Sequence, residues 1–237
     1  MKPWVKPLCA LVTGVATLAI TYGFTQLPEV KAAYPAGDFT LALSTFQRAT
    51  SMDQLTALFG NPPDAVKLAA MTAGNSLDLY AYIPVYTIFL IWTALMLSQD
   101  ASGKGRALQW FAIIAILIGC AGDVLETSSQ LAISTDWNHA AAALPRVASG
   151  CWIKFFGIAV HALGCAALCL TGERKRWILG VLGVLPLIAT AAEYLHLTPI
   201  GAALTPAFAL FWVAVLVVAA ADLFRVTRQP RAANAVA

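Results

Sequence analysis

The sequence predicts an all-α polytopic membrane protein, in which six transmembrane helices form a bundle and a small helical segment caps its exterior end. Two observations carry this prediction, namely the composition and the presence of six long apolar runs. Of the 237 residues, 59% are hydrophobic and 11% are charged, and the mean hydropathy is +0.74. Soluble domains carry about 25% charged residues. The composition therefore argues against a disordered chain, a nucleic-acid-binding domain and most classes of soluble enzyme.

Six segments are long enough to cross a membrane. A transmembrane helix needs about 20 mostly apolar residues to span a hydrocarbon core of about 30 Å. The segments that satisfy this requirement are residues 8–24, 77–97, 107–132, 147–170, 177–197 and 202–224. A short Thr-Pro-Ile-Gly turn separates the last two, which predicts a tight helical hairpin.

Positively charged residues flank these segments unevenly. If the N-terminus is cytoplasmic, ten Lys and Arg residues lie on the inner side and four on the outer side. Because cytoplasmic loops carry an excess of Lys and Arg, this distribution predicts that both termini are cytoplasmic. The inner residues are Lys2, Lys6, Lys104, Arg106, Arg174, Lys175, Arg176, Arg225, Arg228 and Arg231, and the outer ones are Lys31, Arg48, Lys67 and Arg146.

The same topology divides the chain into four parts. Residues 1–26 form the first transmembrane helix, which we expect to be retained rather than cleaved as a signal peptide. Residues 27–75 form the exterior, periplasmic cap, residues 77–224 form a five-helix transmembrane bundle, and residues 225–237 form a cytoplasmic tail. Within the cap, Asp38 and Ser51 are expected helix N-caps, and Gln54 completes a capping box with Ser51. About fifty residues bury little core alone, so we expect the cap to lie on the outer mouth of the bundle.

Ionisable residues occur inside the predicted spans, where they are costly and usually face the interior of the bundle. They are Asp78, Asp123, Glu126, Lys154, His161, Glu193 and His196. In the third span, the two acidic residues share a helical stripe with Ala115, Gly119 and Gly122. In the fourth, Lys154 and His161 share a stripe with Gly150, Gly157 and Gly164. Small residues allow membrane helices to approach closely, so the charged groups are expected in helix contacts.

Three hypotheses explain this polar cluster. In the first, it is a structural lattice in which Lys154 pairs with carboxylates of Asp78, Asp123 or Glu126. In the second, it forms a pocket at outer-leaflet depth, where Lys154 meets the anionic head group of a lipid or another amphiphile. The residues expected to bind such a ligand are Asp78, Tyr82, Tyr86, Asp123, Glu126, Lys154 and His161. The pocket hypothesis makes the protein an accessory or lipid-binding membrane protein, with membrane lipids and a further protein subunit as its expected partners and with no nucleic acid.

The third hypothesis is a membrane-embedded, hydrolase-like metalloenzyme. Its ligands to a divalent metal would be Asp123, Glu126, Glu193 and His196, because Asp-x-x-Glu and Glu-x-x-His each place two ligands on one helical turn. Four-helix carboxylate sites use two Glu-x-x-His motifs, and this sequence has one. No cofactor is favoured by the sequence, no catalytic residue is identified, and enzymatic activity is left open.

Three further expectations concern the polar residues. A proton-coupled carrier is a fourth interpretation, with Asp123 or Glu126 titrating and His161 extending the path inward. Residues 127–130 are expected at the outer surface, where they satisfy the end of the third span. Glu193 and His196 lie close enough to the interface to contact water.

Several of these motifs occur together in a group of uncharacterised bacterial multi-pass membrane proteins, which this chain resembles over residues 38–160. In that group an exterior helical segment precedes an Asp at a span start and a Tyr two turns later, as at Asp78 and Tyr86. An Asp-x-x-Glu follows near the end of the next span, here Asp123 to Glu126, and then a Ser-x-x-x-x-Lys-like opening, which runs from Ser149 to Lys154 here. Where the group often has Asn after the Glu, this chain has Thr127. The resemblance implies no activity, and it fits our expectation of a multi-pass protein of the bacterial inner membrane.

Overall fold

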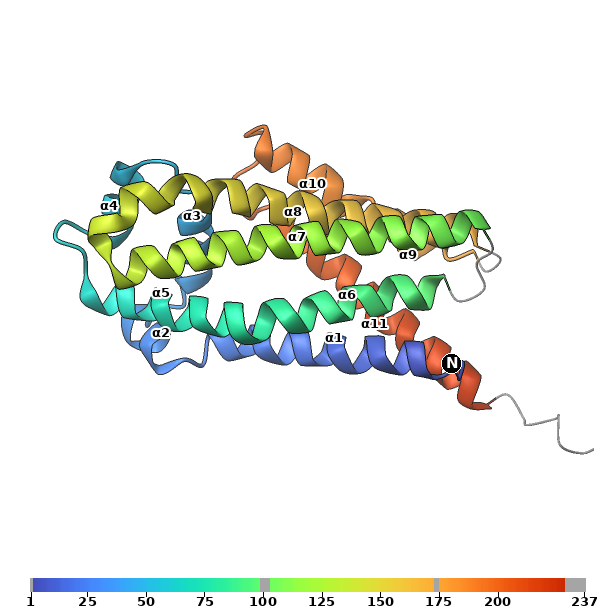
Figure 1. Ribbon diagram of the computed structural model, residues 1–237. Coiled ribbons are helices and arrows are strands. Elements are labelled where there is room, and N and C mark those ends of the chain that lie inside the picture. The colour runs from blue at the N-terminus through green and yellow to red at the C-terminus, as the bar shows by residue number, and fades with distance from the viewer. Residues whose placement is uncertain (1, 99–102, 173–174, 229–237) are drawn as a thin grey trace, which may run out of the picture.

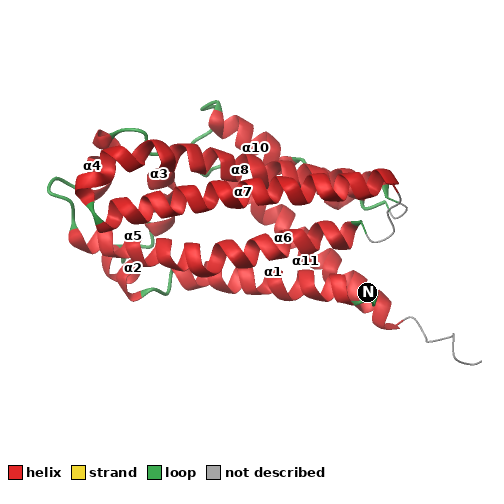
Figure 2. Ribbon diagram, viewed as in Figure 1, coloured by secondary structure: helices red, strands yellow, loops and turns green. Residues whose placement is uncertain are grey.

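The structure is a computed structural model that describes residues 2–98, 103–172 and 175–228, and every regular element in these ranges is helical (Figures 1 and 2). Arg174 and Arg231 of the expected inner charges, and the tail beyond Arg228, lie outside the described residues. The elements are α1 (Val5–Phe24), α2 (Pro28–Ala33), α3 (Phe39–Gln47), α4 (Met52–Phe59), α5 (Ala65–Leu77), η1 (Asp78–Tyr82), α6 (Ile83–Leu97), α7 (Gly103–Thr135), η2 (Trp137–His139), α8 (Ala140–Thr171), α9 (Trp177–Leu182), α10 (Leu185–Tyr194) and α11 (Leu204–Arg228).

Six helical segments are long and apolar enough to cross a membrane, which confirms the predicted fold class. The second segment begins earlier than predicted, because α5, η1 and α6 form one continuous helix over Ala65–Leu97. The fifth segment, Trp177–Tyr194, is divided into α9 and α10. Pro186 lies in the first turn of α10, where its missing N–H leaves no hydrogen bond unmade.

The helices α7 and α8 form a long antiparallel hairpin that runs through the whole molecule (Figure 1). With 33 residues, α7 is about 50 Å long at 1.5 Å per residue. A hydrocarbon core of about 30 Å leaves about 20 Å of this helix outside the membrane. The tip of the hairpin meets α2–α5 at one end of the molecule, whereas the start of α1 and the end of α11 lie at the opposite end.

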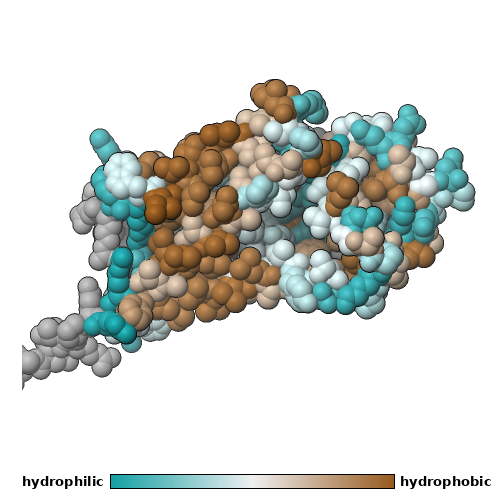
Figure 3. Space-filling view, turned by 180° about the vertical axis from the view of Figure 1, so that it is seen from behind, coloured by the Kyte–Doolittle hydropathy of each residue, from teal (hydrophilic) through white to brown (hydrophobic). Residues whose placement is uncertain are grey.

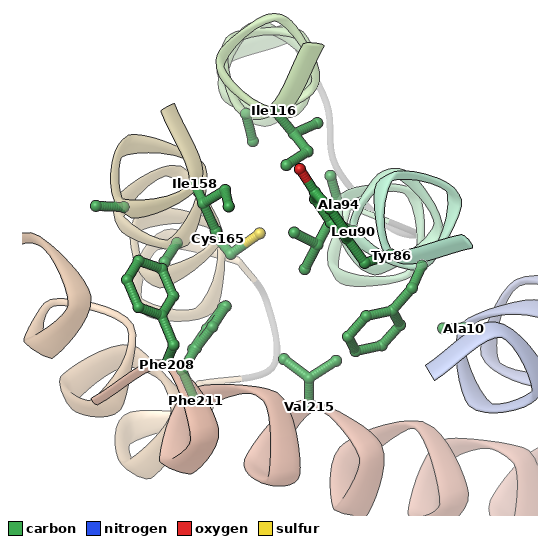
Figure 4. Packing of buried hydrophobic residues seen from close by; sticks show 14 of the residues in the cluster. Ala10, Tyr86, Leu90, Ala94, Ile116, Ile158, Cys165, Phe208, Phe211 and Val215 are labelled. Carbon is green, nitrogen blue, oxygen red and sulfur yellow. The ribbon is translucent and has the colours of Figure 1, made fainter. Parts of the chain in front are cut away.

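Two separate hydrophobic cores divide the molecule along its length. The bundle core brings together α1, α6, α7, α8 and α11, with Tyr86, Ile158 and Phe208 facing its interior (Figure 4). The cap core joins Phe39, Phe46 and Phe59 to residues at the tip of the α7–α8 hairpin. The cap therefore gains its core by packing on the protruding hairpin, which supplies the apolar surface that fifty residues lack.

The outside of the bundle carries the apolar side chains that a lipid environment requires. Val12 on α1, Leu117 on α7 and Val217 on α11 are all exposed. Figure 3 shows the resulting apolar belt between two more polar ends, and a hollow where the belt meets the cap end.

Candidate functional site: a charge network beneath a cavity

A seam of glycines holds α7 and α8 in backbone contact. A Cβ atom at Gly157 would lie 2.5 Å from the Cα of Gly119, and one at Gly150 would lie 2.5 Å from the backbone nitrogen of Glu126. Real Cβ atoms do not approach so closely, so these positions accept glycine alone at this helix separation. The small-residue stripes of the sequence are therefore confirmed as the α7–α8 contact.

This close approach places Lys154 of α8 against the two carboxylates of α7. Its Nζ lies 2.6 Å from Oε2 of Glu126 and 3.1 Å from Oδ1 of Asp123. All three side chains are buried, with Glu126 fully inaccessible. A buried cation needs such partners, because an unpaired charge in a membrane interior is strongly disfavoured.

The network continues from α7 to η1 and α6. The Tyr86 hydroxyl donates a hydrogen bond of 2.7 Å to Oδ2 of Asp123. The Thr127 hydroxyl lies 3.0 Å from Oδ2 of Asp78 and 3.4 Å from Oδ1 of Asp123, so its single proton serves two neighbouring carboxylates. Asp78 has no cation within ion-pair distance in the described part of the chain.

Asp78 opens a π-helical turn that interrupts the second membrane segment. The N–H of Ile83 donates to the carbonyl of Asp78, five residues earlier, and Pro84 follows with no N–H to offer. Single π-helical turns of this kind are frequent at functional sites. Here the first and last residues of the turn, Asp78 and Tyr82, both line a cavity.

This cavity has a volume of about 370 Å³. Its polar side is formed by Asp78, Tyr82, Tyr86, Asp123 and Lys154. Phe155 of α8 also lines it. Further lining residues come from the end of α1, from α3 of the cap and from the start of α11. The volume lies within the range of about 300–1,000 Å³ that small-molecule sites occupy.

The open side of the cavity faces the apolar belt. Leu18 of α1 is 43% exposed and Val213 of α11 is 51% exposed, and both line the cavity. The two helices meet closer to the N-terminal end, where a Cβ at Gly14 would collide with Leu216. Towards the cap they leave room for the cavity between them, and the hollow in Figure 3 lies on this face.

Two of the residues expected in the ligand site do not line the cavity. His161 is fully buried, with Nδ1 3.0 Å from the Ala112 carbonyl and Nε2 3.4 Å from Cys165 Sγ. These contacts tie it to the α7–α8 hairpin. Glu126 reaches the cavity only through its ion pair with Lys154.

The four residues of the metal hypothesis do not form one group, because Asp123 and Glu126 pair with Lys154 and Glu193 has another partner. Glu193 forms an ion pair of 2.5 Å with Arg48 and accepts a hydrogen bond from the Gly201 N–H. It is 3% exposed, so the expectation that it contacts water is wrong, whereas His196 is exposed. Within the described ranges, no group of three or more His, Cys, Asp or Glu residues could hold a metal ion.

Sequence reasoning missed the roles of Arg48 and Thr127. Arg48 was placed among the exterior charges, yet its side chain is 7% exposed and its guanidinium lies over the ring of Phe155, 5.1 Å from the centroid. Of the four residues expected at the surface, Ser128 is exposed, whereas Thr127 and Gln130 are fully buried and Ser129 nearly so, which corrects the expectation for these three. The reason is that α7 continues to Thr135 and the cap covers its last turns. A signal for Thr127 was available, because it is one helical turn from Asp123 on the same face.

The chain was compared with protein-family models, with curated proteins and with solved structures, and no match was found. The functional assignment therefore depends on the geometry of the cavity and of the charge network beside it.

Proposed function

We propose that this protein is an accessory membrane protein that binds a lipid or another amphiphile in the cavity between α1 and α11. In this proposal the protein lies in the bacterial inner membrane, both termini are cytoplasmic, and the cap is periplasmic. The cavity then opens towards the outer leaflet, so that a ligand enters sideways from the bilayer.

The observation that carries the proposal is the cavity itself. A purely structural lattice of Lys154, Asp123 and Glu126 needs its ion pairs but needs no empty space beside them. The cavity joins the charge network to the apolar rim formed by Leu18 and Val213. Such a combination suits a molecule that has one polar end and one apolar chain.

A cavity-filling variant tests the proposal. Ala209 on α11 lines the cavity and is exposed, so Ala209→Trp fills the space without disturbing the core. Ala220 is exposed on the same helix and does not line the cavity, so Ala220→Trp is the matched control. Native mass spectrometry of protein purified in dodecyl maltoside counts the amphiphiles that remain bound to each chain.

We expect the wild-type protein and Ala220→Trp to retain a bound amphiphile, and Ala209→Trp to lose most of it. Equal retention in the two variants would show that the amphiphile binds elsewhere on the apolar belt. A wild-type protein that retains none, even after incubation with membrane lipids, would also contradict the proposal.

A further inference from the structure

We propose that the cavity selects an amphiphile whose head group carries a positively charged nitrogen. This inference rests on the proposed function and adds the chemical class of the ligand. It reverses the expectation, drawn from the sequence, that Lys154 binds an anionic head group.

Both cations of this region, Lys154 and Arg48, are already paired with carboxylates. Lys154 has Glu126 at 2.6 Å and Asp123 at 3.1 Å, and both carboxylates belong to the adjacent helix. Arg48 is paired with Glu193 at 2.5 Å. An anionic head group would have to displace one of these buried carboxylates, which would then be left without a partner.

Carboxylates exceed cations in this region of the molecule. The region contains four carboxylates and two cations, and each of these six side chains is mostly buried. The carboxylates are Asp78, Asp123, Glu126 and Glu193, and the cations are Lys154 and Arg48. In the described part of the chain, Asp78 is the carboxylate of this group that has no cation within ion-pair distance. This residue is 9% exposed and lines the cavity, and the Thr127 hydroxyl is its hydrogen-bond partner. A carboxylate beside an apolar cavity is stabilised by a cation that enters the same space.

Aromatic rings surround the position that such a cation would take. Tyr82 and Tyr86 line the cavity with ring centroids 5.3 Å apart, and Trp212 lies next to Tyr86 at 6.2 Å. Aromatic side chains attract cations through the negative potential of the ring face, and quaternary ammonium groups are bound in this way. Phe155 already contacts Lys154, whose Nζ is 4.8 Å from the centroid of its ring, and Tyr82, Tyr86 and Trp212 are among the lining rings that remain for a ligand.

A series of amphiphiles with one tail and three head groups tests the inference. Dodecyltrimethylammonium, dodecyl phosphate and dodecanol are each added at low mole fraction to dodecyl maltoside micelles that contain the full-length protein. Because a ligand that binds the folded state raises the melting temperature, the mole fraction at half of the maximal shift measures its affinity. The variants are Asp78→Asn and, as a control, Asp53→Asn at an exposed position of the cap.

We expect the ammonium compound to bind the wild-type protein and Asp53→Asn about tenfold more tightly than the phosphate, which is the order of discrimination that desolvated cation–π contacts provide. In Asp78→Asn this preference should fall to about twofold or less. A preference that persists in Asp78→Asn would overturn the assignment to this residue. Tighter binding of the phosphate would overturn the inference as a whole.

The failure of this inference is distinguishable from the failure of the proposed function. If all three compounds bind with equal affinity and Ala209→Trp abolishes their binding, the cavity binds amphiphiles without selecting the head group. If none binds, or if Ala209→Trp has no effect, the proposed function fails as well.

Discussion

Lys154 lies between two carboxylates of α7 that have no other cation within ion-pair distance in the described part of the chain. The attraction within this triad offsets part of the desolvation cost of its three charges, which opposes folding in the membrane. Removing the ammonium group leaves two carboxylates side by side in a buried site. The cost then comes from the orphaned partners more than from the lost contact itself.

Lys154→Ala should therefore lower the free energy of unfolding by about 3 kcal/mol, the lower end of the range for breaking a buried ion pair. Lys67→Ala is the control, because its half-buried ammonium group only donates to the carbonyl of Leu58 in the cap. Thermal unfolding in dodecyl maltoside, followed by circular dichroism, measures the difference. Equal stability of the two variants would contradict a structural role for the triad.

Individual residues differ in how far the sequence could place them. Asp123, Glu126 and Lys154 were predictable as partners, because each stands out as an ionisable group on a stripe of small residues. Arg48 was not predictable, because an arginine at the end of a short exterior helix has the same local pattern whether it faces water or a buried carboxylate.

The pair of helices α7 and α8 determines the geometry of the charge network. Their glycine seam sets the distance between the backbones, and this distance sets how far Lys154 must reach to Asp123 and Glu126. Substituting a glycine of the seam should therefore disturb the ion pairs as well as the packing.

Gly157→Ala tests this relation. The added Cβ would lie 2.5 Å from the Cα of Gly119, and backbone cannot move aside as a flexible side chain can. We expect a loss of about 1–3 kcal/mol in the free energy of unfolding, the usual cost of overpacking. In Gly23→Ala the new Cβ meets only Leu77 at 3.9 Å, so the better helix propensity of Ala should leave stability equal or higher. If both variants unfold alike, the seam does not hold the hairpin together.

The length of α7 also explains why the surface position expected for residues 127–130 is wrong for most of them. The hydrophobic run ends near residue 132, and the expectation that residues 127–130 lie at the surface followed from that end. The helix instead extends to Thr135, and Gln130 and Ile133 of its last turns are covered by neighbouring elements. Hydropathy locates the lipid-facing part of a helix, whereas the protein-covered part depends on what packs against it.

For the molecule as a whole, the ion pair of Arg48 with Glu193 joins the cap to the transmembrane bundle. Arg48 follows α3, which lines the cavity, and Glu193 lies in the last turn of α10. The side chains are 7% and 2% exposed, so this contact is shielded from solvent in a way that surface ion pairs are not. It fixes α3 over the cavity.

A double-mutant cycle of Arg48→Met and Glu193→Gln should give a coupling energy of about 1–3 kcal/mol, as expected for buried residues in direct contact. The control cycle uses Asp136→Asn and His139→Gln, whose hydrogen-bonded contact is solvent-exposed. Its coupling should be clearly smaller, because water and salt screen exposed charges. Unfolding in dodecyl maltoside is again the measurement, and additive effects at Arg48 and Glu193 would show that the cap is held by its apolar contacts alone.

The sequence by itself determined the all-α class, the six membrane segments and the placement of the small-residue stripes of α7 and α8 in helix contacts. These properties follow from hydropathy, helix length and the 3.6-residue period, which are local along the chain. Only the tertiary structure decided that Arg48 enters the bundle, that Lys154 is occupied by two carboxylates, and that Asp78 is left facing a cavity between α1 and α11. Depth and helical face leave the relative rotation and separation of distant helices undetermined, and these quantities decide which charges meet.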